Sequence, residues 1–263
     1  LSSEFQLEEN YKTYNYKKIK SLRYGENPHQ EASLYSFDKE LDWELLQGKE
    51  MSYNNFLDSS AALELVSEFF DVPCCTIIKH LTPCAVALSY DVESAFDKAL
   101  DSDAISPFGG IVAFTKNVNL SLAKKLTAMF LEVIIAPNYD NDALLELQKK
   151  KNLRIIKVNT PLEEINSYIN SYSAEEIRFT PFGVLIQQKD KKELDPKTFK
   201  VVSKKKPEQK EIEDMIFAFK VVKHVKSNAI VVAKDLRTIG ICGGQTNRVS
   251  SVEIALNRVC DSP

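Results

Sequence analysis

Polar side chains able to hold an anion gather in residues 23–30, which read RYGENPHQ. Arg23 carries a planar guanidinium that can bind a phosphate or carboxylate through two parallel hydrogen bonds. A glycine and a proline in the same run restrict the backbone around these side chains. The competing interpretation is an ordinary surface turn, because exposed loops are commonly polar. On the residues alone, both an anion-binding loop and a surface turn stay open.

Lys79 and His80 form a second candidate group. They follow the apolar run CCTII and precede Leu81. Polar residues at the carboxyl end of a buried strand lie where α/β proteins bind ligands. The neighbouring Lys79 disfavours the cationic imidazole, so we expect a neutral His80 that can accept a proton. The alternative is a capping lysine beside a loop histidine with no chemical role.

Residues 240–248, GICGGQTNR, connect an expected strand to an expected helix. Glycine-rich turns of this kind expose backbone N–H groups to anions, although the run matches neither GxGxxG nor a P-loop. Arg248 places a cation at a helix start, where the helix dipole disfavours it, and such conflicts are more common at functional sites. Asn228, at the end of a long expected helix, is either a cap or a ligand-binding residue.

Two further residues have a structural and a functional interpretation. Gly109 lies in SPFGG, which either lets a ligand approach the backbone closely or forms a bulge or tight turn. Glu132 directly precedes an apolar strand-like run. It is either a solvated carboxylate at a strand entrance or a partner for an amine or a ribose hydroxyl.

We expect no metal site. Pro83-Cys84 resembles the start of the PCxxC motif of zinc deaminases, but no second Cys follows and no HxE motif occurs. The chain has 5 cysteines and no CxxC spacing. We expect reduced thiols in a cytoplasmic protein.

Short apolar runs alternate with amphipathic segments, which predicts an α/β protein with buried central strands. Strands are expected at or within residues 73–79, 105–114, 133–136, 154–158, 182–187, 229–233 and 238–242. Helices are expected at residues 59–70 with Asp58 as N-cap, at 120–131, and at 208–226. The last should bury one face, made of Ile212, Met215, Ile216, Phe219, Val222 and Val225. No close sequence repeat is visible.

Composition excludes several classes of protein. The chain has 263 residues, of which 44% are hydrophobic and 27% charged, as in globular domains. Its formal net charge of −3 provides no basic field for nucleic acid. No apolar run approaches the roughly 18 residues of a membrane span. Polar residues 189–206 are expected to be a hinge or linker, and both ends of the chain resemble cut ends.

Taken in order, these segments resemble one family, the transformylases of 5-aminoimidazole-4-carboxamide ribonucleotide (AICAR). The similar motifs are LRYGENPHQ at 22–30, MSYNN at 51–55, IKHLTPCAVA at 78–87, SPFGGIVAF at 106–114, EVIIAP at 132–137 and GICGGQTNR at 240–248. The first motif is highly specific, and the resemblance covers nearly the whole chain. Such transformylases move a formyl group from 10-formyltetrahydrofolate to the amine of AICAR. A separate cyclohydrolase domain then closes the ring to IMP.

The resemblance implies a role for each matching residue. Lys79 and His80 would be the catalytic pair, with His80 taking the amine proton. Lys79 would stabilise charge on the formyl oxygen or act in proton transfer, and Asn228 would orient the formyl group. Substrate-binding positions would be Arg23, Tyr24, Asn55, Gly109, Glu132, Arg248 and Val249. Among these, Arg23 would lie near the nucleotide phosphate and the backbone of Val249 near the folate.

The resemblance also implies a fold like that of cytidine deaminase, with layered sheets, helices on both faces, and two lobes. Residues 1–20 would be a linker from an absent cyclohydrolase domain, 21–188 the first lobe, 189–206 a linker, and 207–263 the truncated start of the second lobe. Part of the folate site would be missing after residue 263. The implied partners are AICAR and a reduced folate, in a cytoplasmic homodimer with its active site at the subunit interface. Neither nucleic acid, nor a membrane, nor a catalytic metal is implied.

Two other interpretations stay open at this point. The chain could be a truncated, non-catalytic nucleotide-binding module that keeps the phosphate-binding residues. It could also be a relative of zinc-dependent deaminases. Nucleotide binding without turnover would favour the first, and stoichiometric zinc would favour the second.

Overall fold

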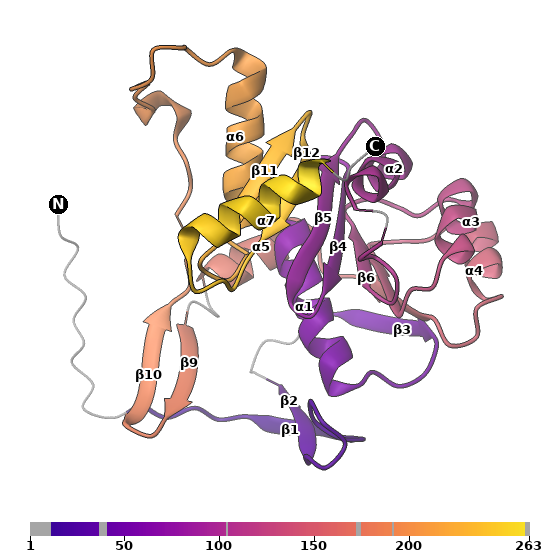
Figure 1. The fold of residues 1–263 in the computed structure, drawn as a ribbon. Coiled ribbons are helices and arrows are strands. Elements are labelled where there is room, and N and C mark those ends of the chain that lie inside the picture. The colour runs from indigo at the N-terminus through magenta and orange to yellow at the C-terminus, as the bar shows by residue number, and fades with distance from the viewer. Residues whose placement is uncertain (1–11, 37–40, 104, 172–174, 191, 261–263) are drawn as a thin grey trace.

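The computed structural model describes residues 12–36, 41–103, 105–171, 175–190 and 192–260. Its centre is an eight-stranded mixed sheet with the order β11-β12-β5-β4-β6-β7-β8-β3 (Figure 1). In chain order these strands are β3 (Trp43–Gln47), β4 (Cys74–Lys79), β5 (Thr82–Leu88), β6 (Ile111–Phe114), β7 (Val133–Ala136), β8 (Arg154–Val158), β11 (Ile230–Lys234) and β12 (Arg237–Cys242). Pairing is parallel from β6 to β8 and antiparallel between the other neighbours.

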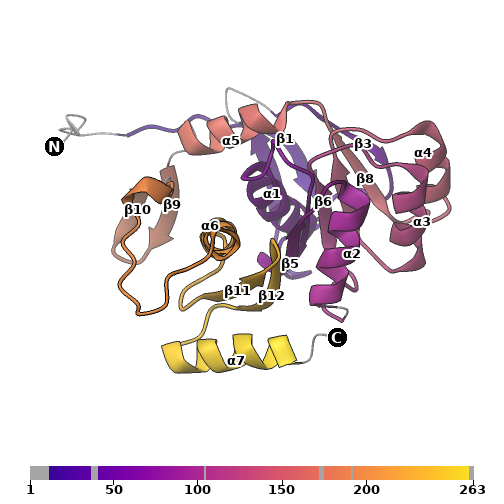
Figure 2. The same cartoon turned by 90° about the horizontal axis from the view of Figure 1, so that it is seen from above.

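Helices cover both faces of the sheet, and the α/β class is confirmed. One face carries α1 (Tyr53–Ser67), α5 (Leu162–Ser171) and α6 (Gln209–Val222), and the other carries α2 (Val92–Ser102), α3 (Leu120–Ala128), α4 (Asn141–Leu147) and α7 (Arg248–Cys260) (Figure 2). In β4, Ile77 packs in the cluster that includes α2, whereas Ile78 packs in the cluster that includes α1 and α6. A strand that is apolar on both faces needs a helical layer on each.

Smaller elements lie outside the central sheet. Strand β1 (Lys17–Leu22) pairs with β2 (Ala32–Ser36), and β9 (Glu175–Thr180) pairs with β10 (Gly183–Gln188). The β9–β10 hairpin stands away from the sheet at the lower left of Figure 1. The 3-10 turn η1 (Pro196–Thr198) lies in the exposed segment before α6.

The strand predictions are confirmed, with ends shifted by a few residues at most positions. Strands β7 and β8 match the expected ranges at both ends, because they are short apolar runs closed by polar or turn residues. Within residues 105–114, only Ile111–Phe114 forms a strand, since the preceding SPFGG run makes a turn. Strands β3 and β5 and helices α2, α4 and α5 were not among the predicted elements.

The predicted start of α1 is wrong. The helix begins at Tyr53, after the N-cap Ser52, whose hydroxyl accepts a hydrogen bond from the Asn55 N–H. The side-chain oxygen of Asn55 in turn accepts a hydrogen bond from the Ser52 N–H, which completes a capping box. This box starts the helix well before Asp58, which therefore lies inside α1 and is free to contact another element.

The predicted buried face of α6 is also wrong in most of its members. The helix buries Phe217 and Val221, and Val225 is buried just beyond its end, whereas Met215 is 48% exposed. The ring of Phe217 packs against Phe69 next to α1, at 5.5 Å between centroids. Because α6 is apolar around much of its circumference, its sequence period does not single out the face that meets α1.

A structural repeat is present that the sequence does not reveal. Elements α1, β4, β5 and α2 form a helix, a two-strand hairpin and a helix, and α6, β11, β12 and α7 repeat this order. Both hairpins turn through two residues with left-handed backbones: His80 and Leu81 in one, Asp235 and Leu236 in the other. A helix carboxylate binds each turn, from Asp58 in α1 and Asp214 in α6.

The two repeats meet between β5 and β12. The pairing register there is a single pair, Arg237 opposite Ala87. The Leu88 N–H donates to the Leu236 carbonyl, and the buried Thr238 hydroxyl bridges the N–H and carbonyl of Val86. Close packing continues behind β12, where a Cβ added to Gly240 would lie 2.2 Å from the Ala255 carbonyl oxygen of α7.

The predicted division into two lobes is not tested by these features and stays a proposal. Residues 21–188 and 207–263 both contribute strands to the same sheet. Of the expected linker at 1–20, residues 1–11 lie outside the described part, and residues 17–20 belong to β1. The expected linker at 189–206 is mostly exposed and begins with an ion pair from Lys189 to Glu64 of α1.

Candidate active site

The predicted site residues gather at one edge of the central sheet, the lower edge in Figure 1. Strands β4 and β12 both run antiparallel to β5, which lies between them, so their carboxyl ends reach the same edge. Strands β6 and β11 begin at that edge because each is antiparallel to one of these two, and β7 begins there beside β6. Lys79, Gly109, Glu132, Asn228 and Arg248 all lie at or just beyond these strand ends.

Lys79 is fixed at the end of β4 by one hydrogen bond. Its Nζ donates to the Phe108 carbonyl oxygen at 2.8 Å. An ammonium group has three donors, so two remain for a ligand. Gly109, the next residue, has a left-handed backbone with φ +74° and donates its N–H to the Phe130 carbonyl. The tight-turn interpretation of SPFGG is therefore correct, and this turn presents the carbonyl that holds Lys79.

Asn55 and Glu132 contact each other across the edge. The buried Asn55 donates from its Nδ2 to Glu132 Oε2 at 2.6 Å, while its other amide atoms cap α1. Arg154, at the start of β8, lies 4.0 Å from the same carboxylate and donates to the Glu50 carbonyl. Sequence reasoning missed Arg154, since its only signal was a position at the start of an apolar run.

His80 occupies the turn between β4 and β5. Its backbone φ is 53° and that of Leu81 is 61°. Left-handed backbones cost about 1 kcal/mol or more for residues other than glycine. Asp58 accepts hydrogen bonds from both N–H groups of the turn, at 3.2 Å from His80 and 2.7 Å from Leu81. The side chain of His80 is exposed toward the edge.

The RYGENPHQ loop is compact and lies against the start of α1. Gly25 donates to the Gln30 carbonyl at 2.7 Å, and the Gln30 side chain accepts from the Asn27 N–H at 2.8 Å. Asn54 of α1 reaches the Glu26 carbonyl at 3.4 Å. The guanidinium of Arg23 lies over the Tyr24 ring, 5.5 Å from its centroid, and Arg23 is exposed. The run therefore forms a turn in which Arg23 is exposed, and anion binding by Arg23 stays a prediction.

Asn228 and Arg248 form a second group around the glycine-rich turn. The backbone and side-chain nitrogens of Asn228 both donate to the Gln245 carbonyl, at 3.2 and 2.9 Å. Helix α6 ends at Val222, so Asn228 is not its cap. Asn228 and Arg248 line a cavity of about 470 Å³ together with Lys223 and Asp190. Helix α7 begins at Arg248, as the sequence predicted.

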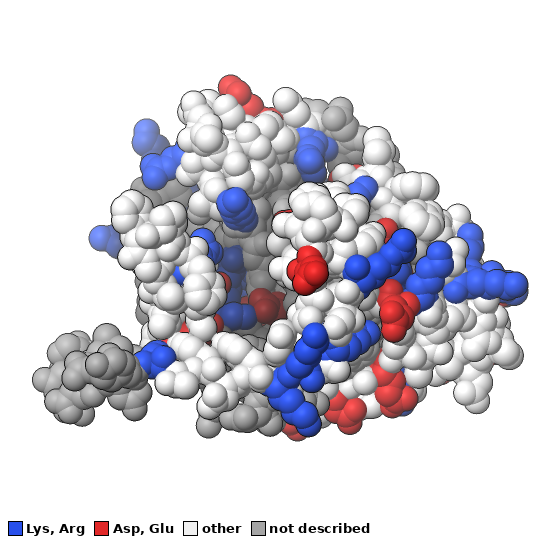
Figure 3. Space-filling model, turned by 90° about the horizontal axis from the view of Figure 1, so that it is seen from below, with Lys and Arg blue, Asp and Glu red and all other residues white. Residues whose placement is uncertain are grey.

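Apart from Arg23 and Tyr24, which lie in the loop against the start of α1, the predicted site residues fall into two groups. One lies at the ends of β4, β6 and β7 and contains Lys79, His80, Asn55, Gly109 and Glu132. The other contains Asn228 and Arg248, with Val249 next to them and 62% exposed. Figure 3 looks at the molecule from the side of this edge and shows a hollow in which side chains of both charges are visible.

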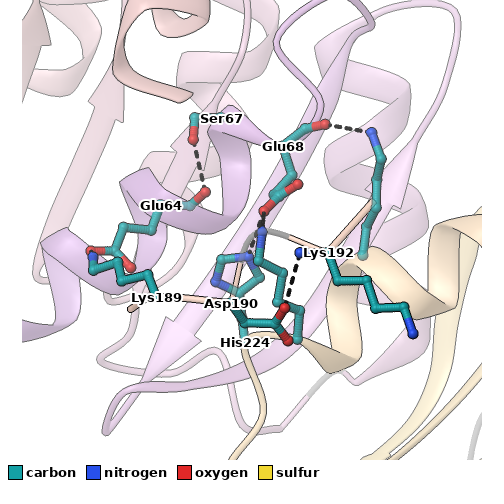
Figure 4. A network of polar contacts seen from close by, with 9 residues as sticks. Glu64, Ser67, Glu68, Lys189, Asp190, Lys192 and His224 are labelled. Carbon is teal, nitrogen blue, oxygen red and sulfur yellow. Dashed lines mark hydrogen bonds and ion pairs between the residues drawn. The ribbon is translucent and has the colours of Figure 1, made fainter. Parts of the chain in front are cut away.

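A partly buried ion-pair network joins the end of α1 to α6 and the residues that follow it (Figure 4). Glu68, after α1, accepts from Lys223 at 2.6 Å and lies 3.3 Å from His224 Nε2. Lys220 of α6 donates to the Glu68 carbonyl at 2.9 Å. Burial raises the pKa of the Glu68 carboxyl, but the bonds from His224 and Lys223 outweigh burial and lower that pKa to about 2.

The cysteines are poor candidates for nucleophiles. Cys74, Cys75 and Cys242 are buried, and all four described cysteines, including Cys84, are free thiols. Burial raises the pKa of Cys74 and Cys75 well above the usual value and that of Cys84 to about 12. Thiolate is the reactive form, so these residues stay unreactive near neutral pH. The side chain of Cys260 lies outside the described residues.

The described part of the chain offers neither a metal-binding cluster nor a membrane-spanning helix. In the ranges that the structure describes, no three His, Cys, Asp or Glu side chains gather where they could hold a metal ion. In the same ranges, no helix is both long and apolar enough to cross a membrane.

Cationic and amide side chains gathered at one edge of an α/β sheet are typical of enzymes and binding proteins that act on small molecules. A sequence model of the family described as AICARFT/IMPCHase bienzyme matches residues 1–258. The chain belongs to this family.

Similar proteins carry the name bifunctional purine biosynthesis protein PurH. The protein of Caldicellulosiruptor saccharolyticus is 47% identical over 255 residues, covering 94% of this chain and 48% of that protein. That of Aquifex aeolicus is 46% identical, covering 92% and 46%. That of Clostridium botulinum strain Kyoto is 46% identical, covering 98% and 51%. The chain therefore spans about half the length of the curated relatives it matches.

Proposed function

We propose that this chain carries the formyl-transfer site of its protein, which moves a formyl group from 10-formyltetrahydrofolate to the amine of AICAR. The observation that carries the proposal is the position of Lys79 and His80 at the sheet edge, beside Asn55, Gly109 and Glu132. Membership of the AICARFT/IMPCHase family supports the same activity.

The chemistry needs the groups that this edge supplies. The amine of AICAR is conjugated with a carboxamide and is a weak nucleophile. Its nitrogen attacks the formyl carbon, the bond from that carbon to the folate nitrogen breaks, and a proton passes from the amine to that nitrogen. His80 accepts and returns this proton, and Lys79 stabilises the negative charge on the formyl oxygen.

The remaining predicted residues would bind the two substrates. Arg23, Tyr24, Asn55, Gly109 and Glu132 are assigned to the nucleotide, with Arg23 at its phosphate. Asn228, Arg248 and Val249, around the 470 Å³ cavity, are assigned to the formyl group and the substrates near it. No step in this scheme uses a metal ion.

We also propose the assembly and setting of the full-length protein. It is a cytoplasmic homodimer with the active site at the subunit interface, and it also closes the ring to IMP. The bifunctional name of the relatives supports the second activity. Exposed apolar side chains on the β9–β10 hairpin, including Phe179 and Leu185, support a subunit contact there. Residues 21–188 and 207–263 remain our proposed lobes.

The test combines binding with turnover in the full-length protein. Isothermal titration with AICAR and with a folate analogue should show binding of both, and His80→Ala should abolish formyl transfer. Nucleotide binding with no formyl transfer by the wild type would instead indicate a non-catalytic module. Stoichiometric zinc in a metal assay would contradict the metal-free scheme.

A further inference from the structure

We propose that Asp58 is a positioning residue that holds His80 in its catalytic position by fixing the backbone of the β4–β5 turn. The inference rests on the proposed function, because it gives His80 the role of proton acceptor. Asp58 would not touch either substrate. It would act through the turn alone.

The turn has a conformation that its own residues do not favour. A two-residue hairpin turn with two left-handed residues normally takes Asn-Gly or Asp-Gly. Here the residues are His80 and Leu81, with φ values of 53° and 61°. Leu81 is 49% exposed, so burial of its side chain does little to hold the turn. A conformation of this kind persists only where the surroundings determine it.

Asp58, which lies in α1, holds the turn in this conformation. Its Oδ2 accepts from the His80 N–H and its Oδ1 from the Leu81 N–H, so each carboxylate oxygen binds one residue of the turn. Among the described residues, the other polar contact to the turn is a 3.3 Å bond from the Thr82 hydroxyl to the His80 carbonyl. The imidazole makes no hydrogen bond or ion pair within the same described set, so the backbone sets its position.

The same face of α1 also holds the nucleotide side of the site. Residues three apart lie on one face of a helix, and Asn55 and Asp58 have this spacing. Asn55 binds Glu132 while Asp58 binds the His80 turn. The capping box at Ser52 fixes the start of this helix. The first turns of α1 therefore set the distance between His80, the proposed proton acceptor, and the Glu132 carboxylate.

The structural repeat provides a matched control. Asp214 of α6 binds the turn at Asp235 and Leu236 in the same way, at 3.0 and 2.7 Å. Both of those residues also have φ values of 57°. That turn lies at the opposite edge of the sheet, because it joins the far ends of β11 and β12. The same substitution at Asp214 thus disturbs an equivalent turn without touching the site.

The experiment compares Asp58→Asn with Asp214→Asn in the full-length protein. Asparagine keeps the size of the side chain but has one acceptor oxygen in place of two. We expect Asp58→Asn to lower kcat roughly 10- to 100-fold, with KM for AICAR within about threefold, because misplaced catalytic groups lose rate rather than binding. Asp214→Asn should lose a similar amount of thermal stability and keep kcat within about twofold.

A second variant tests whether the backbone is the cause. Glycine adopts left-handed conformations without penalty, so adding Leu81→Gly to Asp58→Asn should recover at least about threefold of the lost kcat relative to Asp58→Asn alone. If Asp58→Asn does not fold, the double variant is compared with Leu81→Gly alone. Its kcat should lie within about threefold of that of Leu81→Gly, because glycine makes the Asp58 bonds dispensable for the turn, and a deficit of about tenfold or more would overturn the proposal. Equal loss of kcat in Asp58→Asn and Asp214→Asn would overturn it as well.

Backbone NMR separates this proposal from the proposed function. Loss of the Asp58 bonds should shift the amide signals of His80 and Leu81, and Asp214→Asn should leave them in place. If Asp58→Asn keeps full activity and leaves the His80 and Leu81 amide signals unshifted, the positioning role of Asp58 is contradicted but the proposed function is not. A wild-type protein that binds AICAR but transfers no formyl group would contradict the proposed function, and the turn would then have no catalytic group to position.

Discussion

Side chains at the sheet edge differ in how many of their polar atoms the protein already uses. The amide oxygen of Asn55 accepts bonds at the start of α1, and its Nδ2 donates one bond to Glu132. Lys79 donates one bond to the Phe108 carbonyl, whereas Arg23 and Arg248 are exposed. We therefore expect Asn55 to position Glu132 while offering one N–H to the nucleotide, and Lys79 to meet the ligand with two.

Replacing Lys79 should separate rate from binding. Lys79→Ala removes the charge assigned to the formyl oxygen, so formyl transfer should be lost while AICAR binding stays within about tenfold. Kinetics together with isothermal titration measure both quantities. Lys116→Ala is a suitable control, since Lys116 also donates to a phenylalanine carbonyl, that of Phe70. A loss of AICAR affinity as large as the loss of rate would contradict the assignment of Lys79.

Glu132 should matter for the nucleotide more than for stability. Glu132→Gln keeps an oxygen that can accept the bond from Asn55 but removes the negative charge. We expect KM for AICAR to rise about tenfold with kcat within about threefold, and little change in Tm. Asn55→Ala should lower Tm instead, because the side-chain half of the α1 capping box and the bond to Glu132 are lost. An unchanged KM in Glu132→Gln would remove Glu132 from the nucleotide site.

At the level of elements, α1 links the two halves of the edge through its two ends. Its start holds Asn55 and Asp58, and just after its end Glu68 binds Lys223 and His224 beyond α6. The glycine-rich group depends on this second link, because Lys223 and Asn228 line the same cavity. A change at Glu68 should therefore loosen α6 before it affects Lys79.

Glu68 should give the protein an acid-sensitive stability. Because the folded-state pKa of Glu68 is lowered to about 2, its contribution is present above its unfolded value near 4.5 and is lost as pH falls toward 2. Glu68→Gln should lower the free energy of unfolding at pH 7 by about 2 kcal/mol and flatten its decline in this acid range. Urea unfolding at pH 7, 4 and 3 measures this. An equal acid dependence in wild type and variant would exclude Glu68 as the cause.

Local patterns predict most strands of the central sheet, although not β3 and β5, and they predict the helix contacts poorly. β7 and β8 are recognisable because strands buried on both faces form short, continuous apolar runs. The start of α1 is missed because Ser52 and Asn55 cap it while Asp58 looks like a cap from the sequence alone. The face of α6 is missed because the ring of Phe69, distant in sequence, selects Phe217.

The candidate site shows the same limit. Lys79, Glu132 and Arg248 follow from their places at element ends, which local sequence indicates. The contacts that organise them join residues far apart in the chain: Asp58 to the His80 turn, and Arg154 to Glu132. The repeat is equally hidden, since its two copies share little beyond a helix aspartate and a two-residue turn.

At the scale of the whole molecule, the β9–β10 hairpin exposes a group of large apolar side chains. Every residue of β10 is exposed, and the exposed apolar side chains of the hairpin include Phe179, Phe182, Val184 and Leu185. Large exposed apolar patches commonly mark protein–protein interfaces. The segment before β1 also reaches this hairpin, since the Tyr14 hydroxyl donates to Glu175 at 2.9 Å.

Charge on this hairpin should weaken the proposed homodimer. We expect Phe179→Asp combined with Leu185→Asp to raise the dimer dissociation constant at least about 100-fold, because two buried charges would lack partners. Sedimentation velocity over a range of protein concentrations measures this constant. Tyr90→Asp, at a position 84% exposed after β5, should leave it unchanged. An unchanged dimer in the double variant would place the interface elsewhere.

The short pairing between β5 and β12 has a consequence for local unfolding of the molecule. Elsewhere in the sheet, neighbouring strands pair along several residues, but within the sheet the two repeats are joined here by one register pair, one backbone bond and the Thr238 hydroxyl. Proteins unfold locally in cooperative units, and units joined by few contacts open at lower free energy. Once the Glu68 bonds and the Phe69–Phe217 contact between α1 and α6 open, we therefore expect α6, β11, β12 and α7 to exchange their amide protons together, before strands β4 to β8. Asn228 and Arg248 would leave the edge with them, while Lys79 and His80 stayed in place.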